Sequence, residues 1–244
     1  MNVLSLFSGV GGLELGLERA GMTTVGQVEI DSYCRRVLAK HWPEVPRYDD
    51  VRTADAWWRS EPRPTVDVVA GGFPCQPVSD AGLQLAQDDE RWLWPEMHAV
   101  IADIRPTWVV AENVPGLLRR GLTAVVNDLE RTGYRVRVGH TSACAVGAPH
   151  PRARLFVLAH TESQGRCPGG VIRGSALAEG GEHPAGRGPG GRNWWATEPD
   201  MGRVAYGIPH GVDRRRALGN AVAPQVAERI GRLIMAAEPG ERAA

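Results

Sequence analysis

Short apolar runs alternate with amphipathic stretches through the first 160 residues of the chain. The apolar runs that read as strands lie at residues 2–7, 24–30, 66–70 and 107–111. Apolar residues at helical spacing predict helices over 13–20, 32–41, 54–59 and about 92–104. This alternation is typical of an α/β domain with a mostly parallel sheet, and it places the functional site at the edge where the strands end.

The second half of the chain changes character after residue 159. Before that point we expect a helix over 121–132 and a pair of strands over Tyr134–Thr141 and Arg152–Ala159. Residues 165–191 hold ten glycines and three prolines among few apolar groups, which predicts a loop-rich insert without a core of its own. A helix from about Pro224 carries one apolar stripe, and we expect it to return to the first domain.

The first predicted strand ends in a glycine-rich turn, Phe7-Ser8-Gly9-Val10-Gly11-Gly12. Such a turn lets a ligand approach the backbone and directs N–H groups at the start of a helix toward a carboxylate or phosphate. The glycines do not have the G-x-G-x-x-G spacing, so the pattern does not favour a dinucleotide site.

Acidic residues follow the next strand. Glu29 lies about 20 residues beyond the glycine turn, where Rossmann-like proteins bind ribose hydroxyls, so it suggests a nucleoside-containing cofactor. Its neighbour Asp31 better fits an N-terminal cap for the helix over 32–41. Asp50 is expected beside the same edge of the sheet.

A single thiol stands in the stretch Gly71-Gly72-Phe73-Pro74-Cys75-Gln76-Pro77-Val78-Ser79. Prolines on both sides of Cys75 fix the backbone, and the glycines before it allow a sharp turn, so the loop should hold the sulfur in one place. A cysteine attacks as its thiolate and needs an accessible loop for that. A small buried hydrophobe is the alternative for any lone cysteine, and the prolines and glycines argue against it.

Four further residues are candidates for chemistry. Glu112 closes the strand over 107–111, although a helix-capping acid would look the same. Arg152 and Arg154 share strand parity and point to one face, or are simple surface charges. Asn220 follows Gly219 and could be only a turn former.

Composition narrows the class of protein. A length of 244 residues suits one α/β domain with an appendage. The four cysteines are widely and irregularly spaced, so we expect neither disulfides nor a metal site. The apolar start lacks a basic leader and no run reaches membrane-spanning length, so we expect a soluble cytoplasmic protein with no membrane partner.

The charge distribution is a weaker guide. Net charge is zero, but residues 1–150 carry 15 basic and 19 acidic side chains, whereas residues 151–244 carry 13 and 9. All basic residues except Lys40 are arginines, which suit phosphates and guanine edges. A GC-rich genome would produce the same composition.

Taken in order, these motifs resemble those of the DNA cytosine-5 methyltransferases. The motifs are Phe7-Ser8-Gly9-Val10-Gly11-Gly12, Pro74-Cys75-Gln76, Glu112-Asn113-Val114, Arg152-Ala153-Arg154 and Gly219-Asn220-Ala221-Val222. The resemblance implies a Rossmann-like S-adenosylmethionine-dependent methyltransferase sheet with a small loop-rich target-recognition region. It divides the chain into a catalytic and cofactor-binding domain over 1–159, the target-recognition region over 160–216 and a returning helix over 217–244.

The resemblance also implies a pocket for S-adenosyl-L-methionine. Glu29 would bind the ribose, Ile30 would face the adenine and Asp50 would accept from the adenine amino group. Asn220 and Ala221 would close the methionine end. The full implied set is Phe7, Ser8, Gly9, Gly11, Gly12, Leu13, Glu29, Ile30, Asp50, Val51, Pro74, Asn220 and Ala221.

By the same resemblance, Cys75 would add to carbon 6 of a flipped cytosine so that carbon 5 can take the methyl group. Glu112 would hold the base, and Arg154 and Arg152 would steady the base and the Cys75 loop. We expect double-stranded DNA as partner, a monomer, and a short G·C-rich site of about two to five base pairs. The implied DNA-binding residues are Gln76, Ser79, Arg192, Arg203, Arg214 and Arg215.

Three alternatives belong to other classes. A tRNA cytosine-5 methyltransferase shares this fold and catalytic set, but its characteristic Cys-Phe-Thr segment is absent. A catalytically silent DNA-binding relative would be expected to lose Cys75 or Glu112, and both are present. A nicotinamide oxidoreductase lacks support, because no phosphate-binding fingerprint occurs and the thiol loop would be unexplained.

Two residues depart from the family pattern. His150 stands where the family often has glutamine, and Ile30 stands where a larger aromatic residue is common. Neither departure removes a reacting group.

Overall fold

The computed structural model describes residues 1–74, 92–148, 152–161 and 211–237. Its centre is a seven-stranded sheet in the order β3-β2-β1-β4-β5-β7-β6. The strands are β1 (Asn2–Leu6), β2 (Thr23–Val28), β3 (Arg47–Tyr48), β4 (Val68–Gly72), β5 (Trp108–Asn113), β6 (Tyr134–Ser142) and β7 (Ala153–Thr161). The α/β fold class predicted from the alternation of apolar runs is confirmed.

The sheet is parallel from β3 to β5 and changes direction at β7, which runs antiparallel to both β5 and β6. This confirms the mostly parallel sheet and the predicted strand pair. The register sets Gly72 at the end of β4 opposite Glu112 on β5, and Glu112 opposite Phe156 on β7. Gly72, Glu112 and Phe156 thus lie side by side on the neighbouring strands β4, β5 and β7.

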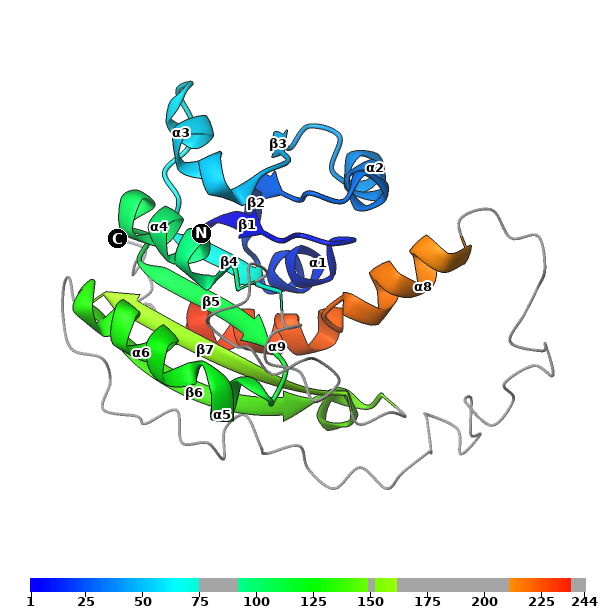
Figure 1. The fold of residues 1–244 in the computed structure, drawn as a ribbon. Helices are drawn as coiled ribbons and strands as arrows, with labels where there is room; N and C mark the ends of the chain where they lie inside the picture. The colour runs from blue at the N-terminus through cyan, green and yellow to red at the C-terminus, as the bar shows by residue number, and fades with distance from the viewer. Residues whose placement is uncertain (75–91, 149–151, 162–210, 238–244) are drawn as a thin grey trace, which may run out of the picture.

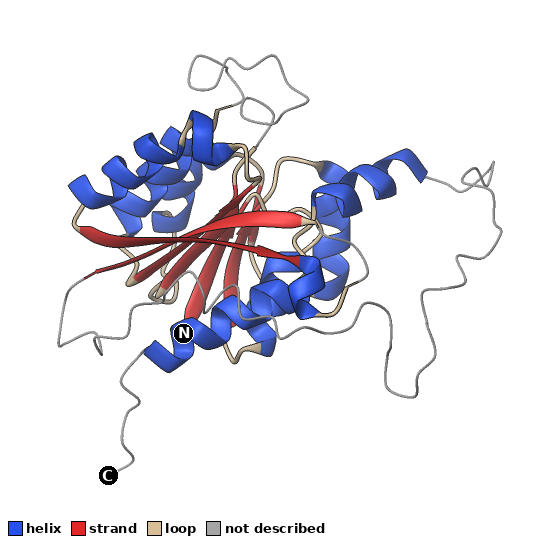
Figure 2. Ribbon diagram, turned by 90° about the horizontal axis from the view of Figure 1, so that it is seen from below, coloured by secondary structure: helices blue, strands red, loops and turns tan. Residues whose placement is uncertain are grey.

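Helices cover both faces of the sheet (Figures 1 and 2). Their bounds are α1 (Gly12–Arg19), α2 (Ser32–His41), α3 (Ala54–Arg59), α4 (Trp94–Ile104), α5 (Leu117–Arg120), α6 (Leu122–Arg131), α8 (Gly211–Asn220) and α9 (Pro224–Ala237), with short 3-10 turns η1 (Val51–Thr53) and η3 (Ala143–Val146). One apolar cluster joins the sheet to α3, α4 and α6, and a second joins it to α1 and α9. Both faces of the central strands are therefore buried, which explains why those strands are almost wholly apolar.

Two glycines allow α1 and α9 to pack closely. A Cβ on Gly16 of α1 would lie 2.3 Å from the Pro224 carbonyl oxygen and 2.4 Å from the Ala227 Cβ. A Cβ on Gly231 of α9 would lie 2.6 Å from the Ala20 Cβ. The C-terminal helix thus packs against the first helix of the chain, which follows the glycine-rich turn.

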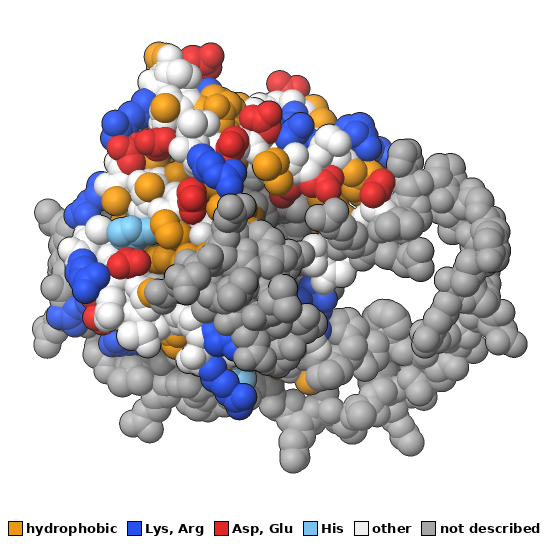
Figure 3. Space-filling model, in the orientation of Figure 1, with side chains coloured by type: hydrophobic (Ala, Val, Ile, Leu, Met, Phe, Trp, Pro, Cys, Tyr) orange, Lys and Arg blue, Asp and Glu red, His pale blue; other side chains and the backbone are white. Residues whose placement is uncertain are grey.

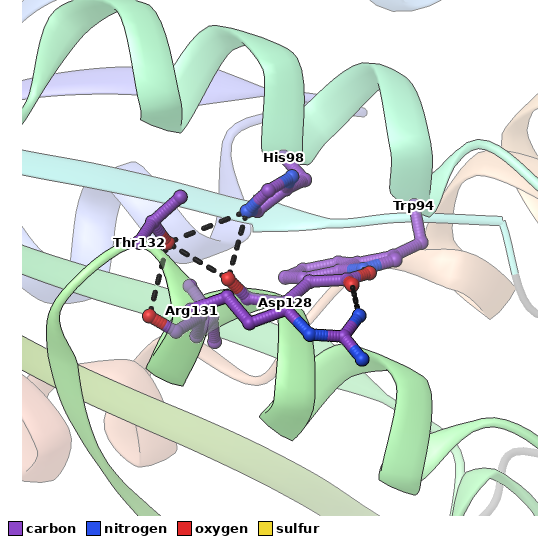
Figure 4. A network of polar contacts seen from close by, with 6 residues as sticks. Trp94, His98, Asp128, Arg131 and Thr132 are labelled. Carbon is purple, nitrogen blue, oxygen red and sulfur yellow. Dashed lines mark hydrogen bonds and ion pairs between the residues drawn. The ribbon is translucent and has the colours of Figure 1, made fainter.

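A polar network ties α4 to α6 on the opposite face (Figure 4). The indole Nε1 of Trp94 donates to Asp128 at 3.0 Å, and His98 Nε2 lies 3.1 Å from the Asp128 carbonyl oxygen. The Thr132 hydroxyl donates to that same carbonyl at 2.8 Å. The network fixes the start of α4, which is the first helix after residues 75–91.

Most helix boundaries agree with the sequence. Asp31 caps α2 as predicted, because its Oδ1 accepts from the amides of Tyr33 at 2.8 Å and Cys34 at 3.1 Å. The helix α8 was not predicted, since residues 211–220 show no apolar stripe. The three predicted domains stay a prediction, because residues 162–210 lie outside the described part of the chain. Within the described part, no helix is long and apolar enough to cross a membrane.

Replacing Gly16 by valine should lower the free energy of unfolding by about 3 kcal/mol, because the new side chain overlaps the backbone of α9. Chemical unfolding followed by circular dichroism measures the change. Gly219→Ala is the matched control: among the described residues, no atom beyond its own stretch of helix lies within 4 Å of its Cβ position, so stability should be unchanged or slightly higher. Equal stability of Gly16→Val and the native chain would contradict this packing.

Candidate active site

The glycine-rich turn follows β1 and bends sharply. Phe7, Gly9 and Gly11 have φ values of 55°, 57° and 88°. The Ser8 amide donates to the Val28 carbonyl oxygen at 3.1 Å, which ties the turn to the end of β2. Positive φ is readily adopted by glycine and is uncommon at phenylalanine, so Phe7 is a conformational exception beside the predicted cofactor site.

The C-terminal segment lies directly against this turn. A Cβ on Gly12 would be 2.3 Å from the Val222 carbonyl oxygen, and a Cβ on Gly11 would be 2.4 Å from the Trp42 ring. Val222 therefore lies against the start of α1, and Ala221 lines the same groove as Gly12. Asn220 is exposed at the end of α8.

Glu29 connects the turn to the segment after β2. Its two carboxylate oxygens accept from the amides of Gly9 and Asp31, each at 2.7 Å. Burial raises the pKa of Glu29, and these two amide hydrogen bonds oppose the rise. Each carboxylate oxygen can accept a second hydrogen bond, so Glu29 retains acceptor capacity for hydroxyl groups.

Ile30, next to Glu29, exposes its apolar side chain at the same edge. It is 69% exposed. Arg35 Nη1 donates to the carbonyl oxygens of Glu29 and Ile30, each at 2.9 Å, and so fixes the backbone of this segment. The arrangement leaves the isoleucine free to lie against a flat apolar ligand.

Asp50 stands at the end of the adjacent strand β3. The Glu29 amide donates to the Tyr48 carbonyl oxygen at 2.9 Å, which brings the ends of β2 and β3 together. One Asp50 oxygen accepts from the Arg52 amide at 3.0 Å, and Val51 beside it is buried. Glu29, Ile30 and Asp50 are thus gathered at one edge, as the sequence predicted.

The second part of the site is a buried acid paired with an arginine. Glu112 Oε1 lies 2.7 Å from Arg154 Nε, and the side chains are only 8% and 17% exposed. Burial raises the pKa of Glu112 to about 7, although the charges of Arg154 and Arg152 oppose this. Glu112 can therefore be either protonated or ionised near neutral pH.

Gly72 makes room for that acid. A Cβ on Gly72 would lie 2.8 Å from Glu112 Oε2, closer than a side chain could come. The glycine was expected to help form the turn before Cys75, but its contact with Glu112 was missed. Any larger residue would displace the carboxyl group.

Asn113 is a second residue that the sequence analysis did not single out for a role. Its side chain is 2% exposed. Its Nδ2 donates to the Phe73 carbonyl oxygen at 3.1 Å, and its Oδ1 accepts from the Val114 amide at 2.8 Å. Asn113 thus fixes the backbone two residues before Cys75 relative to Glu112. The local pattern held no signal for this contact beyond the presence of a polar residue at a strand end.

Aromatic rings hold the same backbone segment from the other side. Phe73 is 2% exposed and its ring centroid lies 5.5 Å from that of Trp92 and 5.4 Å from that of Trp94. Phe73 and Trp92, which lie on either side of residues 75–91 in the sequence, are therefore in contact.

Arg152 joins the second part of the site to the C-terminal segment. Its Nη2 donates to the carbonyl oxygens of Gly219 and Ala221, each at 2.7 Å. A groove of about 1070 Å³ runs between the turn, α2 and the start of α9, and both arginines line it together with Gly12 and Val222. Arg152 is thus a structural link as well as a charge near Glu112.

The remaining predicted site residues divide into two groups. Ser8, Leu13 and Val51 are buried beside the turn and the end of β3, and Pro74 is half-buried at the end of the described segment after β4. The second group lies outside the described residues and consists of Cys75, Gln76, Ser79, Arg192 and Arg203. The side chains of Arg214 and Arg215 in α8 are not described either. Among the described residues, no group of histidine, cysteine, aspartate and glutamate could hold a metal ion.

The pKa of Glu112 makes stability depend on pH. The folded protein binds a proton more tightly than the unfolded chain, so the contribution of Glu112 falls as pH rises from about 4.5 to about 7 and is constant above. The native protein loses this contribution as pH rises, whereas Glu112→Gln does not. The unfolding free energy of Glu112→Gln, relative to that of the native protein, should therefore increase by about 3 kcal/mol between pH 4.5 and pH 7. Urea unfolding at pH 5, 6, 7 and 8 tests this. A constant difference between the two proteins would contradict the burial of Glu112.

Curated relatives match about two thirds of the chain. Type II methyltransferase M2.BsuMI of Bacillus subtilis is 38% identical over 171 residues, which is 65% of this chain and 42% of that protein. Type II methyltransferase M.Eco47II of Escherichia coli is 39% identical over 166 residues, or 64% of this chain and 39% of that protein. The matched part thus spans about two fifths of the length of these relatives.

Solved structures agree with the fold. The methyltransferase EhMeth of Entamoeba histolytica superimposes with a TM-score of 0.55 at 22% identity, covering 66% of this chain and 52% of that one. The fold is therefore that of the Rossmann-like S-adenosylmethionine-dependent methyltransferases. Residues 1–171 match the family model of C-5 cytosine-specific DNA methylases, and the chain belongs to that family.

Proposed function

We propose that this chain transfers a methyl group from S-adenosyl-L-methionine to carbon 5 of cytosine in double-stranded DNA. The observation that carries the proposal is the buried pair of Glu112 and Arg154, held against the backbone that leads to Cys75. A carboxyl group with a pKa near 7 beside a thiol loop suits a reaction on a base that must be both held and polarised.

The cofactor fits the edge formed by β1, β2 and β3. Glu29 has acceptor capacity for the ribose hydroxyls, exposed Ile30 offers a face for the adenine, and Asp50 can accept from its amino group. The turn from Phe7 to Gly12, with Leu13, Val51 and Pro74 around it, would hold the rest, and Asn220 and Ala221 would close the methionine end. When bound, the cofactor supplies an electrophilic methyl group.

Cys75 and Glu112 prepare the cytosine. The Cys75 thiolate adds to carbon 6, which makes carbon 5 nucleophilic, while protonated Glu112 donates to ring nitrogen 3 and accepts from the exocyclic amine. Once carbon 5 carries the methyl group, its proton is lost to a base. The electrons of that C–H bond form the double bond between carbons 5 and 6 as the bond between carbon 6 and sulfur breaks, and the electrons of the carbon–sulfur bond leave with the regenerated thiolate.

The arginines keep this acid in place. Arg154 neutralises the ionised form of Glu112 at 2.7 Å and holds its carboxyl group at the end of β5. Arg152 adds positive charge that lowers the pKa of Glu112, and it fixes the segment of Ala221 beside the turn. Together they keep the base-binding part of the site next to the cofactor-binding part.

The target cytosine has to leave the stacked duplex to reach Glu112, so base flipping is part of the proposal. Gln76 and Ser79 would lie near the gap, and the segment over 160–216, with Arg192, Arg203, Arg214 and Arg215, would choose a short G·C-rich sequence. On the face seen in Figure 3, acidic and basic side chains are interspersed over the described surface. The described residues on this face form no continuous basic patch, and we expect the arginine-bearing segment to contribute to phosphate binding.

Incubation of the protein with tritiated S-adenosylmethionine and plasmid DNA should label the DNA, and nucleoside analysis should find 5-methylcytosine. Glu112→Gln should lower the rate by at least about 100-fold, since it cannot share a proton with ring nitrogen 3 in the same way. Label on tRNA alone, which the tRNA methyltransferase alternative requires, would refute the proposal, as would label on the exocyclic nitrogen.

Duplex DNA containing 5-fluorocytosine should trap the Cys75 adduct. With S-adenosylmethionine present, carbon 5 takes the methyl group but then has fluorine in place of a proton, so the bond between sulfur and carbon 6 cannot be released and a complex stable on a denaturing gel is expected. Cys75→Ala should give none, whereas Cys144→Ala, which removes an exposed thiol elsewhere, should trap as the native protein does. Trapping by the Cys75→Ala protein would place the nucleophile elsewhere.

A further inference from the structure

A fully buried acid lies behind the cofactor turn and has no role in the steps above. Glu14, in the first turn of α1, is 0% exposed. Neither of its carboxyl oxygens has a partner at full hydrogen-bond geometry among the described residues. Buried polar atoms are almost always satisfied, so this acid calls for an explanation.

Two hydroxyl groups share its surroundings. Ser5 on β1 and Ser8 in the turn are 1% and 7% exposed, and the Ser8 hydroxyl donates to Ser5 Oγ at 3.1 Å. Burial raises the pKa of Glu14 to about 7, and the nearby charge of Glu18 raises it slightly. Hydrogen bonding from the backbone amide of Glu14 itself, and after it from Ser5 and Ser8, acts in the opposite direction. A small adjustment of side chains would therefore join the three groups into one network.

Ser8 connects this network to the cofactor turn. Its amide donates to Val28 at the end of β2, and its carbonyl oxygen accepts from the Gly11 amide at 3.0 Å. In the same turn, the Gly9 amide donates a hydrogen bond to the Glu29 carboxylate. A shift of Ser8 would thus be passed to the two glycines that approach the ligand and to the proposed ribose-binding acid.

Burying this acid works against folding. Removing a carboxyl group from water costs free energy unless its hydrogen bonds are replaced, and an apolar side chain of similar volume avoids that cost. Leu13 and Leu17, its neighbours on α1, are buried in this apolar way. Stability alone would therefore favour leucine at position 14.

We propose that Glu14 is a positioning residue of the cofactor turn, which it holds from inside the protein through the hydroxyl groups of Ser5 and Ser8. This rests on the proposed cofactor site. It predicts that affinity for the cofactor and stability of the fold respond in opposite directions when the acid is removed.

The test measures S-adenosylhomocysteine binding by calorimetry and unfolding by urea, on the same preparations of the full chain. Glu14→Leu should weaken binding about three- to tenfold while its stability equals or exceeds that of the native protein. Glu14→Gln keeps a donor and an acceptor in place and should bind within about twofold of the native protein. Thr24→Val is the matched control, because its buried hydroxyl on β2 also lacks a partner among the described residues and its affinity should not change.

Ser8→Ala gives a second route to the same answer. It should weaken binding to a similar degree, and the double variant with Glu14→Leu should be little worse than either single variant, because both interrupt one connection. The proposal would be overturned if Glu14→Leu bound S-adenosylhomocysteine as tightly as the native protein, or if the losses of affinity in the two single variants added up in the double variant. It would also be overturned if Glu14→Leu lost both affinity and stability, because that result indicates a general structural role. Failure of the native protein to bind S-adenosylhomocysteine would instead refute the cofactor assignment.

Discussion

The ion pair between Glu112 and Arg154 depends on one reversal of strand direction. In the parallel part of the sheet, every strand begins at the edge opposite the site, so a residue at a strand start could not reach it. Because β7 runs antiparallel to β5, its first residues lie beside the last residues of β5. The reversal thus brings an arginine from the start of one strand to an acid at the end of another.

Close backbone approach makes the rest of the site possible. The carboxyl group of Glu112 occupies space that only a glycine at position 72 leaves open, and the amide of Asn113 holds the Phe73 carbonyl oxygen on the same side. The acid is thereby kept out of water at a position where a charged group is costly, and its pKa rises as a result. The close backbone approach therefore sets both the position of the Glu112 carboxyl group and its raised pKa.

Local signals in the sequence account for much of this architecture. The strands, the cap of α2 by Asp31 and the gathering of Glu29 with Asp50 follow from apolar periodicity and strand ends, and each is present in the structure. The contact of Asn113 with Phe73 joins residues 40 positions apart, so no local pattern announces it.

Two other features were beyond a reading of the sequence. The helix α8 carries three consecutive arginines and no apolar stripe, so hydrophobic periodicity passes over it. The sequence analysis did not single out Glu14, because its burial depends on which helix packs over it rather than on its own neighbours in the chain. The sequence therefore indicated which residues gather at the edge of the sheet. The contacts that hold them there, such as those of Gly72 with Glu112 and of Asn113 with Phe73, become visible only in the tertiary structure.

The packing of α9 on α1 also bears on how the chain is made. The seven strands of the sheet are synthesised before residues 224–237 leave the ribosome, so one apolar face of the sheet has no cover from α9 until then. The carbonyl oxygens that bind Arg152 also lie 67 and 69 positions downstream of it. A nascent chain would thus expose apolar surface late in synthesis, and the proposed cofactor site would be among the last parts of the protein to form.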